Sequence, residues 1–174
     1  MKISGMPRLF ITSTVLLLVV ALIEKAILSN LLFLPAVPDL SMICILFISL
    51  HDGRFVGEST GFISGLLLDF LGSGPFGLNC FYRTLFGYLS GALNKILNTR
   101  SFFLPLLFGL IACAAKALLL LLVEILFPFV NIDFSPFTWP FVFECIENTV
   151  LTPFVFMLLN LFDKSLILKP ESIV

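Results

Sequence analysis

Charged residues are scarce in this chain of 174 residues. They make up 12% of the sequence, whereas 59% of the residues are hydrophobic and the mean hydropathy is +1.14. Soluble domains carry roughly a quarter charged residues, so this chain lacks the charge to cover a water-facing surface. Its apolar runs, such as 16–20 and 118–122, are continuous rather than alternating, which also excludes a β-barrel. The composition predicts an all-α integral membrane protein that lies in the lipid bilayer.

The sequence also lacks the residue sets that metals, nucleic acids and covalent chemistry require. The single histidine, His51, and four cysteines without a CxxC pair leave no closely spaced metal ligands. Ten basic against eleven acidic residues give a net charge of −1, which offers no basic surface to nucleic acid. Membrane serines such as Ser64 and Ser90 have no histidine to activate them. We therefore expect a protein that is not an enzyme and needs neither metal nor cofactor.

Six apolar segments are predicted to form helices, although the second is short for a full span of about 20 residues. Proline, glycine and polar residues separate them, most clearly in the stretch 72–77. The turn-forming residues of that stretch are Gly72, Gly74, Pro75 and Gly77. The expected helices cover residues 8–28, 38–50, 55–71, 78–97, 102–127 and 140–162. We interpret 1–174 as one polytopic domain with six transmembrane helices and a short cytoplasmic tail, 163–174.

Basic residues predict the orientation, because cytoplasmic segments of membrane proteins carry an excess of lysine and arginine. With the N-terminus inside, the outer segments hold only Lys25, and Arg83 and Lys116 lie within helices. The cytoplasmic segments hold Lys2, Arg8, Arg54, Lys95, Arg100, Lys164 and Lys169. We therefore expect both termini to be cytoplasmic.

Glycines recur every four residues on two neighbouring predicted helices. They are Gly57, Gly61 and Gly65 on the third helix and Gly87 and Gly91 on the fourth. Small residues at this spacing let two helix backbones approach closely in lipid. Because the turn between these helices makes them antiparallel neighbours, we hypothesise that the two glycine stripes face each other. The alternative is that a membrane helix simply tolerates scattered glycines.

Ionisable residues inside a bilayer are costly unless they are paired or hydrated, so they mark candidate sites. Asp69 and Arg83 flank the turn, each within about two helical turns of the outer surface. We predict that they form an ion pair that pins the hairpin; contact with a ligand or partner is the alternative.

A second set of ionisable residues falls in the outer half of the predicted bundle. Its members are Asp39, Lys116, Glu124, Glu144 and Glu147. Lys116 and Glu147 are predicted to lie at a similar depth in the bilayer, which alone makes an ion pair between them plausible. The set predicts a water-accessible cavity, or a partner groove, that opens away from the cytoplasm. The alternative is that several of these acids are interfacial and hydrated.

Four stretches between residues 38 and 91 carry a family pattern. They are Pro38-Asp39-Leu40, Gly61-Phe62-Ile63-Ser64-Gly65-Leu66-Leu67-Leu68-Asp69, Gly74-Pro75-Phe76-Gly77-Leu78 and Gly87-Tyr88-Leu89-Ser90-Gly91. In these stretches, in its length and in its six-helix plan, the chain resembles the bacterial rod shape-determining protein MreD family. The first, fifth and sixth predicted helices agree with that family only in hydropathy. The link at 51–54 is less basic than the family pattern.

The resemblance implies a non-enzymatic scaffold of the cell-elongation machinery in the bacterial inner membrane. In that family the protein partners with MreC, a single-span protein with an extracytoplasmic domain. Together they link the cytoplasmic actin-like MreB filament, directly or indirectly, to the enzymes that build lateral peptidoglycan. Applied here, the glycine-lined hairpin is expected to be scaffold, and the outer-half polar residues are candidate partner contacts.

The alternative function is a substrate-binding subunit of an energy-coupling-factor vitamin importer. Such subunits are similar in plan, with six helices, a similar length and a pocket that opens outward. Their first helix typically carries alanines four residues apart. Here Ala21 and Ala26 are five apart, and Val19 and Val20 stand where small residues are wanted. The first helix therefore argues against the importer.

Overall fold

The computed structural model describes residues 6–30, 36–72, 74–94, 103–128, 138–162 and 166. These residues form six α-helices and one short 3₁₀ helix. In chain order they are α1 (Met6–Ala26), η2 (Leu28–Asn30), α2 (Leu40–Asp52), α3 (Arg54–Leu71), α4 (Leu78–Gly91), α5 (Phe103–Leu126) and α6 (Trp139–Asn160). The prediction of an all-helical protein is confirmed. The fourth helix ends at Gly91, short of the expected bound; residues 95–97 and the expected tail, apart from Leu166, lie outside the described residues.

Three of the described helices are long and apolar enough to cross a membrane: α1 with its extension to Asn30, α5 and α6. Of the others, α2 is apolar but has only 13 residues, which is about 20 Å at 1.5 Å per residue. The hydrocarbon core of a bilayer is about 30 Å thick. By length and composition alone, three of the described helices qualify as membrane spans, because the helices between α1 and α5 are shorter or more polar. The six expected spans stay a prediction.

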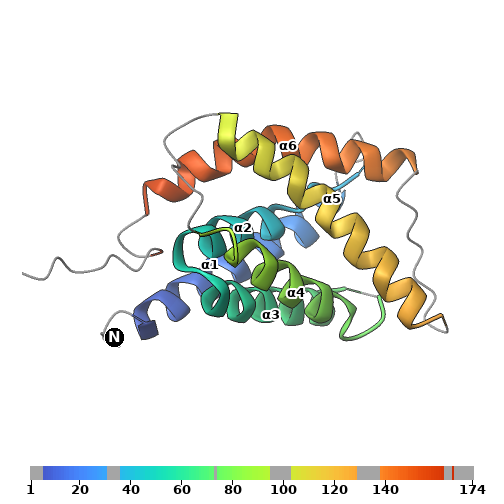
Figure 1. Cartoon of the computed structure of the whole chain (residues 1–174), viewed down its shortest axis with the longest axis horizontal. Coiled ribbons are helices and arrows are strands. Elements are labelled where there is room, and N and C mark those ends of the chain that lie inside the picture. The colour runs from blue at the N-terminus through green and yellow to red at the C-terminus, as the bar shows by residue number, and fades with distance from the viewer. Residues whose placement is uncertain are drawn as a thin grey trace, which may run out of the picture.

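The short helix α2 lies at the centre of the bundle. Ten of its 13 residues are buried, and it packs against α1, α3, α4 and α6. Figure 1 shows α5 and α6 on one side of it and α1 and α3 on the other. Phe47 of α2 meets Phe156 of α6 edge to face, with ring centroids 5.1 Å apart. A helix that is apolar all round is the expected pattern for one enclosed by its neighbours.

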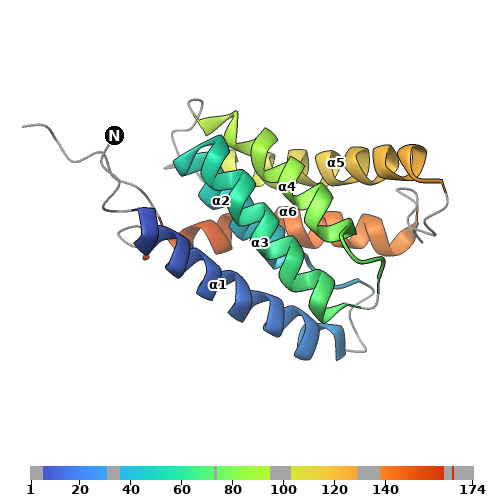
Figure 2. The ribbon, with the colours of Figure 1, turned by 90° about the horizontal axis from the view of Figure 1, so that it is seen from below.

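The closest helix pair is the antiparallel hairpin of α3 and α4, which run side by side in Figure 2. A Cβ atom added at Gly57 would lie 2.3 Å from the carbonyl oxygen of Gly87, and one added at Gly87 would lie 2.0 Å from that of Gly57. A Cβ at Gly61 would lie 2.2 Å from the carbonyl oxygen of Arg83. A Cβ atom added at Gly65 or Gly91 would also lie too close to backbone, 2.4 Å and 2.7 Å from the nearest backbone atom. The two glycine stripes therefore lie against each other, with no room for side chains between the backbones.

We predict that Gly61→Ala destabilises the protein, because its methyl group would overlap backbone of α4 rather than a movable side chain. Overpacking of this kind costs about 1–3 kcal/mol, and it should lower the melting temperature measured by circular dichroism in mild detergent. Gly74→Ala is the matched control, since nothing lies within 4 Å of a Cβ added there. Equal melting temperatures for the two variants would contradict this account of the hairpin.

Candidate functional site

Asp39 is the centre of a buried polar network. It is the N-cap of α2, and its side chain accepts a hydrogen bond from the Met42 N–H at 3.0 Å. Its own backbone N–H donates to Oδ1 of Asn148 on α6 at 2.8 Å. A carboxylate is favoured at this position because the first N–H groups of a helix are otherwise unsatisfied and carry partial positive charge. Helix capping thus places a carboxylate, 6% exposed, inside the bundle.

Arg83 of α4 supplies the opposite charge. Its Nη2 donates to both carboxylate oxygens of Asp39 at 2.7 Å, and both side chains are buried. The Nε and Nη1 atoms of Arg83 are also buried, but they have no hydrogen-bond partner among the residues that the structure describes. Removing one partner of a buried ion pair costs about 3–5 kcal/mol, so this contact holds α2 and α4 together.

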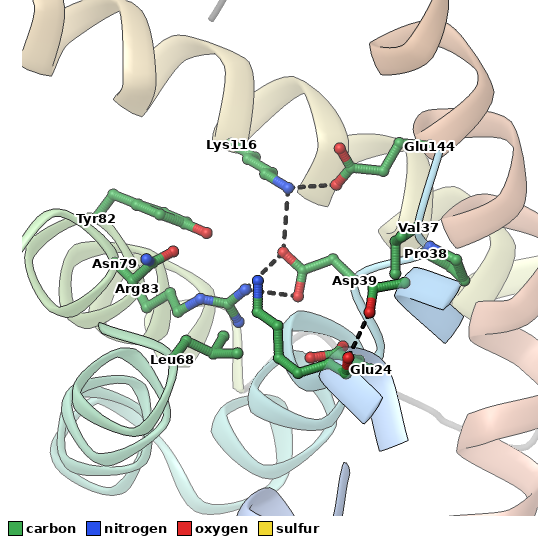
Figure 3. Close-up of a pocket in the computed structure, with 12 residues that line it drawn as sticks. Glu24, Val37, Pro38, Asp39, Leu68, Asn79, Tyr82, Arg83, Lys116 and Glu144 are labelled. Atoms are coloured by element: carbon green, nitrogen blue, oxygen red, sulfur yellow. Dashed lines mark hydrogen bonds and ion pairs between the residues drawn. The ribbon is translucent and has the colours of Figure 1, made fainter. Parts of the chain in front are cut away.

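Lys116 extends the network to α5 and α6. Its Nζ lies 3.1 Å from Oδ2 of Asp39 and forms a second ion pair with Glu144 of α6. Asn148, one turn further along α6, donates to the same Glu144 oxygen at 3.4 Å. Figure 3 shows Arg83 and Lys116 reaching the Asp39 carboxylate from two directions. One carboxylate therefore joins α2 with α4 and α5, and through Lys116 with α6.

Glu24 connects α1 to the same end of α2. Its Oε1 accepts a hydrogen bond from the Ser41 N–H, and its Oε2 accepts one from the Ser41 hydroxyl, both at 2.7 Å. Glu24 is 5% exposed although it lies close to the end of α1. Two carboxylates from different elements thus satisfy the first N–H groups of one helix.

The network borders a cavity of about 210 Å³. Its charged lining residues are Glu24, Lys25, Asp39, Arg83, Lys116 and Glu144. Three acids therefore face three bases, and their formal charges balance. Within the described residues, no group of three or more histidine, cysteine, aspartate or glutamate side chains is arranged to hold a metal ion. The arrangement is suited to fixing helices and to hydrogen-bonding a small polar group.

Asp69 has a different partner from the one predicted. Its Oδ2 accepts from the backbone N–H groups of Gly77 at 3.0 Å and Cys80 at 3.1 Å. Its Oδ1 accepts from the N–H and the side-chain amide of Asn79, at 3.1 and 3.0 Å. Gly77 is the N-cap of α4 and has no side chain to satisfy these groups, so Asp69 caps α4 from the neighbouring helix. The predicted ion pair with Arg83 is therefore wrong, although Asp69 does pin the hairpin.

The five predicted outer-half residues do not all meet. Asp39, Lys116 and Glu144 come together, whereas Glu124 is exposed near the end of α5 and Glu147 is half-buried on α6. The predicted Lys116–Glu147 ion pair is wrong. Lys116 pairs instead with Glu144, which lies nearly one turn earlier on α6.

Two members of the network were missed by the sequence analysis, Glu24 and Asn148. An acid that interrupts the apolar run of the first helix is a signal that marks Glu24. Asn148 lies four residues after Glu144, so helical spacing places both on one face. The contact of each with the start of α2 depends on tertiary packing, which neither signal predicts.

We predict that Asp39 and Arg83 are energetically coupled and that Asp69 and Arg83 are not. Asp39→Asn and Arg83→Gln should each lower the free energy of unfolding in detergent by about 3–5 kcal/mol. The double variant should lose much less than the sum, because the second change removes a charge that the first has left unpaired. Combining Asp69→Asn with Arg83→Gln should give the sum of the two losses. Additivity in the first cycle, or strong coupling in the second, would contradict the observed pairing.

Comparison with known proteins agrees with the resemblance seen in residues 38–91. A sequence model of the family described as rod shape-determining protein MreD matches residues 6–162, which include all six described helices. No curated protein matches the chain. The family match lends no support to the vitamin-importer alternative. The chain therefore belongs to the MreD family of rod shape-determining membrane proteins.

Proposed function

We propose that this protein is a non-enzymatic scaffold of the bacterial cell-elongation complex. In this proposal it couples an MreC-like single-span partner and the lateral peptidoglycan synthesis enzymes, directly or indirectly, to a cytoplasmic MreB-like filament. Membership of the MreD family supports a role in rod-shape determination. The structural observation that carries the scaffold role is the Asp39 network, which links α2 to α4, α5 and α6.

A scaffold has to hold its helices in fixed relative positions, and the charges in this site are used for that purpose. Arg83 and Lys116 both bind Asp39, and Lys116 also binds Glu144. Each of these ion pairs joins two different helices, so displacing one helix breaks its ion pairs with its neighbours. The close backbone contacts of α3 and α4 add a second rigid element. These features favour a platform for other proteins over a site for chemistry.

We also propose that the chain crosses the inner membrane six times, in a plan similar to that of energy-coupling-factor substrate subunits. The short helix α2 is compatible with this proposal because it is surrounded by other helices. Glu24 accepts the N–H of Ser41, and the Asp39 side chain accepts that of Met42. The other N–H groups in the first turn of α2 donate to backbone carbonyls, so none of them needs a partner from water. The excess of basic residues in the predicted inner segments supports cytoplasmic termini.

The proposed orientation predicts the behaviour of reporters fused to the C-terminus. A fluorescent protein that folds only in the cytoplasm should be bright in this position, and alkaline phosphatase, which folds only outside it, should be inactive. The same two reporters placed after Gly74 should behave in the opposite way, because the α3–α4 turn is expected outside. Active phosphatase at the C-terminus would contradict the proposed orientation while leaving the fold intact.

Glu124 is the member of the outer-half set that is best placed to contact a partner. It is exposed near the C-terminal end of α5 and lies outside the Asp39 network. In the proposed orientation this end faces away from the cytoplasm, the side on which an MreC-like partner carries its extracytoplasmic domain. An exposed acid there offers a contact that can change without disturbing the ion pairs that hold the helices.

We predict that Glu124→Lys weakens the complex without unfolding the protein. In cells depleted of their own copy, the unaltered chain should restore rod shape, and Glu124→Lys should leave cells wide or round. It should also reduce the amount of MreC-like protein that co-purifies in mild detergent. Glu58→Lys is the matched control, since Glu58 is exposed near the opposite end of the molecule, on α3. Normal cell shape after depletion alone would contradict the scaffold proposal.

A further inference from the structure

The α3–α4 hairpin has a short apolar surface. On α3 the exposed side chains of Phe62 and Phe70 follow one face, and the helix ends at Gly72. The lower limit of this strip is Glu58, one turn before Phe62 on the same face. Glu58 is exposed and forms no ion pair within the part of the chain that the structure describes. From Glu58 to Gly72 the helix rises about 21 Å, at 1.5 Å per residue.

The neighbouring helix α4 has a polar boundary at the same level. Gly87 packs against Gly57, so the residues that follow them, Tyr88 and Glu58, lie at nearly the same height on the two helices. Tyr88 is exposed, and the guanidinium of Arg54 lies over its ring, with Cζ 5.5 Å from the ring centroid. Tyrosine is enriched at membrane–water interfaces, where its ring is apolar and its hydroxyl is hydrated. A carboxylate on α3 and a tyrosine on α4 therefore mark one boundary.

The opposite side of the molecule is taller. Figure 1 shows α5 and α6 on the other side of α2 from α1 and α3. Exposed apolar side chains run from Phe103 to Leu122 on α5 and from Val142 to Leu161 along α6. Each of these strips rises about 29 Å. The protein thus presents apolar surfaces of two different heights to the lipid.

The two heights differ in how they fit a bilayer. The hydrocarbon core is about 30 Å thick, which the strips on α5 and α6 match and the hairpin falls short of by about 9 Å. A helix that is too long can tilt, whereas beside one that is too short the bilayer becomes thinner or flanking side chains extend to the interface. Lysine and arginine extend in this way, but Glu58 has a shorter side chain. The carboxylate therefore fixes the boundary near its own level.

We infer that the bilayer is locally thinned beside the α3–α4 hairpin, with Glu58 and Tyr88 at one boundary and the turn that begins at Gly72 at the other. The partner that fits this face is lipid with a compressed or short-chain hydrocarbon layer. The inference rests on the proposed six-span arrangement, in which α3 and α4 cross the membrane. It adds that the two sides of the protein set different bilayer thicknesses.

The test uses the full chain in phosphatidylcholine vesicles whose monounsaturated chains range from about 14 to 22 carbons, with melting temperatures measured by circular dichroism. We expect the unaltered chain to be most stable in chains shorter than about 18 carbons. Glu58→Leu extends the apolar strip to Arg54, by about 6 Å, and should move this optimum to longer chains. Glu124→Leu is the matched control, because Glu124 is an exposed acid near the end of the taller helix α5. An optimum that Glu58→Leu leaves unchanged, or that both variants shift equally, would overturn the inference.

A second measurement reads the boundary directly. Trp139 is the only tryptophan in the sequence, so Trp139→Phe allows a single reporter at Phe62 or Phe55, two exposed positions on either side of Glu58. In dioleoyl lipid we expect Phe62→Trp to be quenched by lipids brominated on their chains, and Phe55→Trp to be quenched by acrylamide in the water. Protection of Phe55→Trp from acrylamide would overturn the thinning alone. If brominated chains quench neither reporter, the hairpin does not cross the bilayer, and the six-span proposal fails as well.

Discussion

The structure depends on one buried carboxylate and the two cations that bind it. A charge at the depth of Asp39 is expensive unless opposite charges lie against it, and Arg83 and Lys116 both do so. Each cation comes from a different helix, so the requirement to neutralise Asp39 becomes a requirement on where α4 and α5 stand relative to α2. Glu144 then neutralises the remaining charge of Lys116 and brings in α6.

The glycine contacts and the ion pairs are parts of one arrangement. Gly61 approaches the backbone of Arg83 itself, since a Cβ added there would lie 2.2 Å from the Arg83 carbonyl oxygen. The close approach of α3 to α4 therefore acts at the same residue whose side chain reaches Asp39. At the other end of α2, Ser49 and Ser90 share a hydrogen bond of 2.7 Å, which ties the same helix to α4 a second time. The central helix is thus held at both ends and can be short.

Local patterns in the sequence predict the helices and the glycine contacts, but not the choice of ion-pair partners. Spacing of four residues identifies Gly57, Gly61 and Gly65 as one face, and that inference needs no tertiary information. Counting outward from the turn predicts one depth for Asp69 and Arg83, but the register of the hairpin places Gly61, about two turns before Asp69, against Arg83, so the two side chains lie at different levels. Asp69 is instead engaged by the start of α4, because Gly77 leaves those N–H groups without a cap.

The two aspartates show why a capping residue can also organise a site. Asp39 and Asp69 both accept backbone N–H groups at the start of a helix. Asp69 accepts three of them and also the Asn79 side-chain amide, whereas Asp39 accepts one and leaves room for Arg83 and Lys116. The side chains that fix the helices are therefore the same ones that line the cavity. Because coupling between binding and conformation is reciprocal, a group that binds Arg83 in this cavity changes the position of α4 relative to α2 only if it binds one arrangement of these helices more tightly than another. Conversely, a partner that shifts these helices must change the cavity.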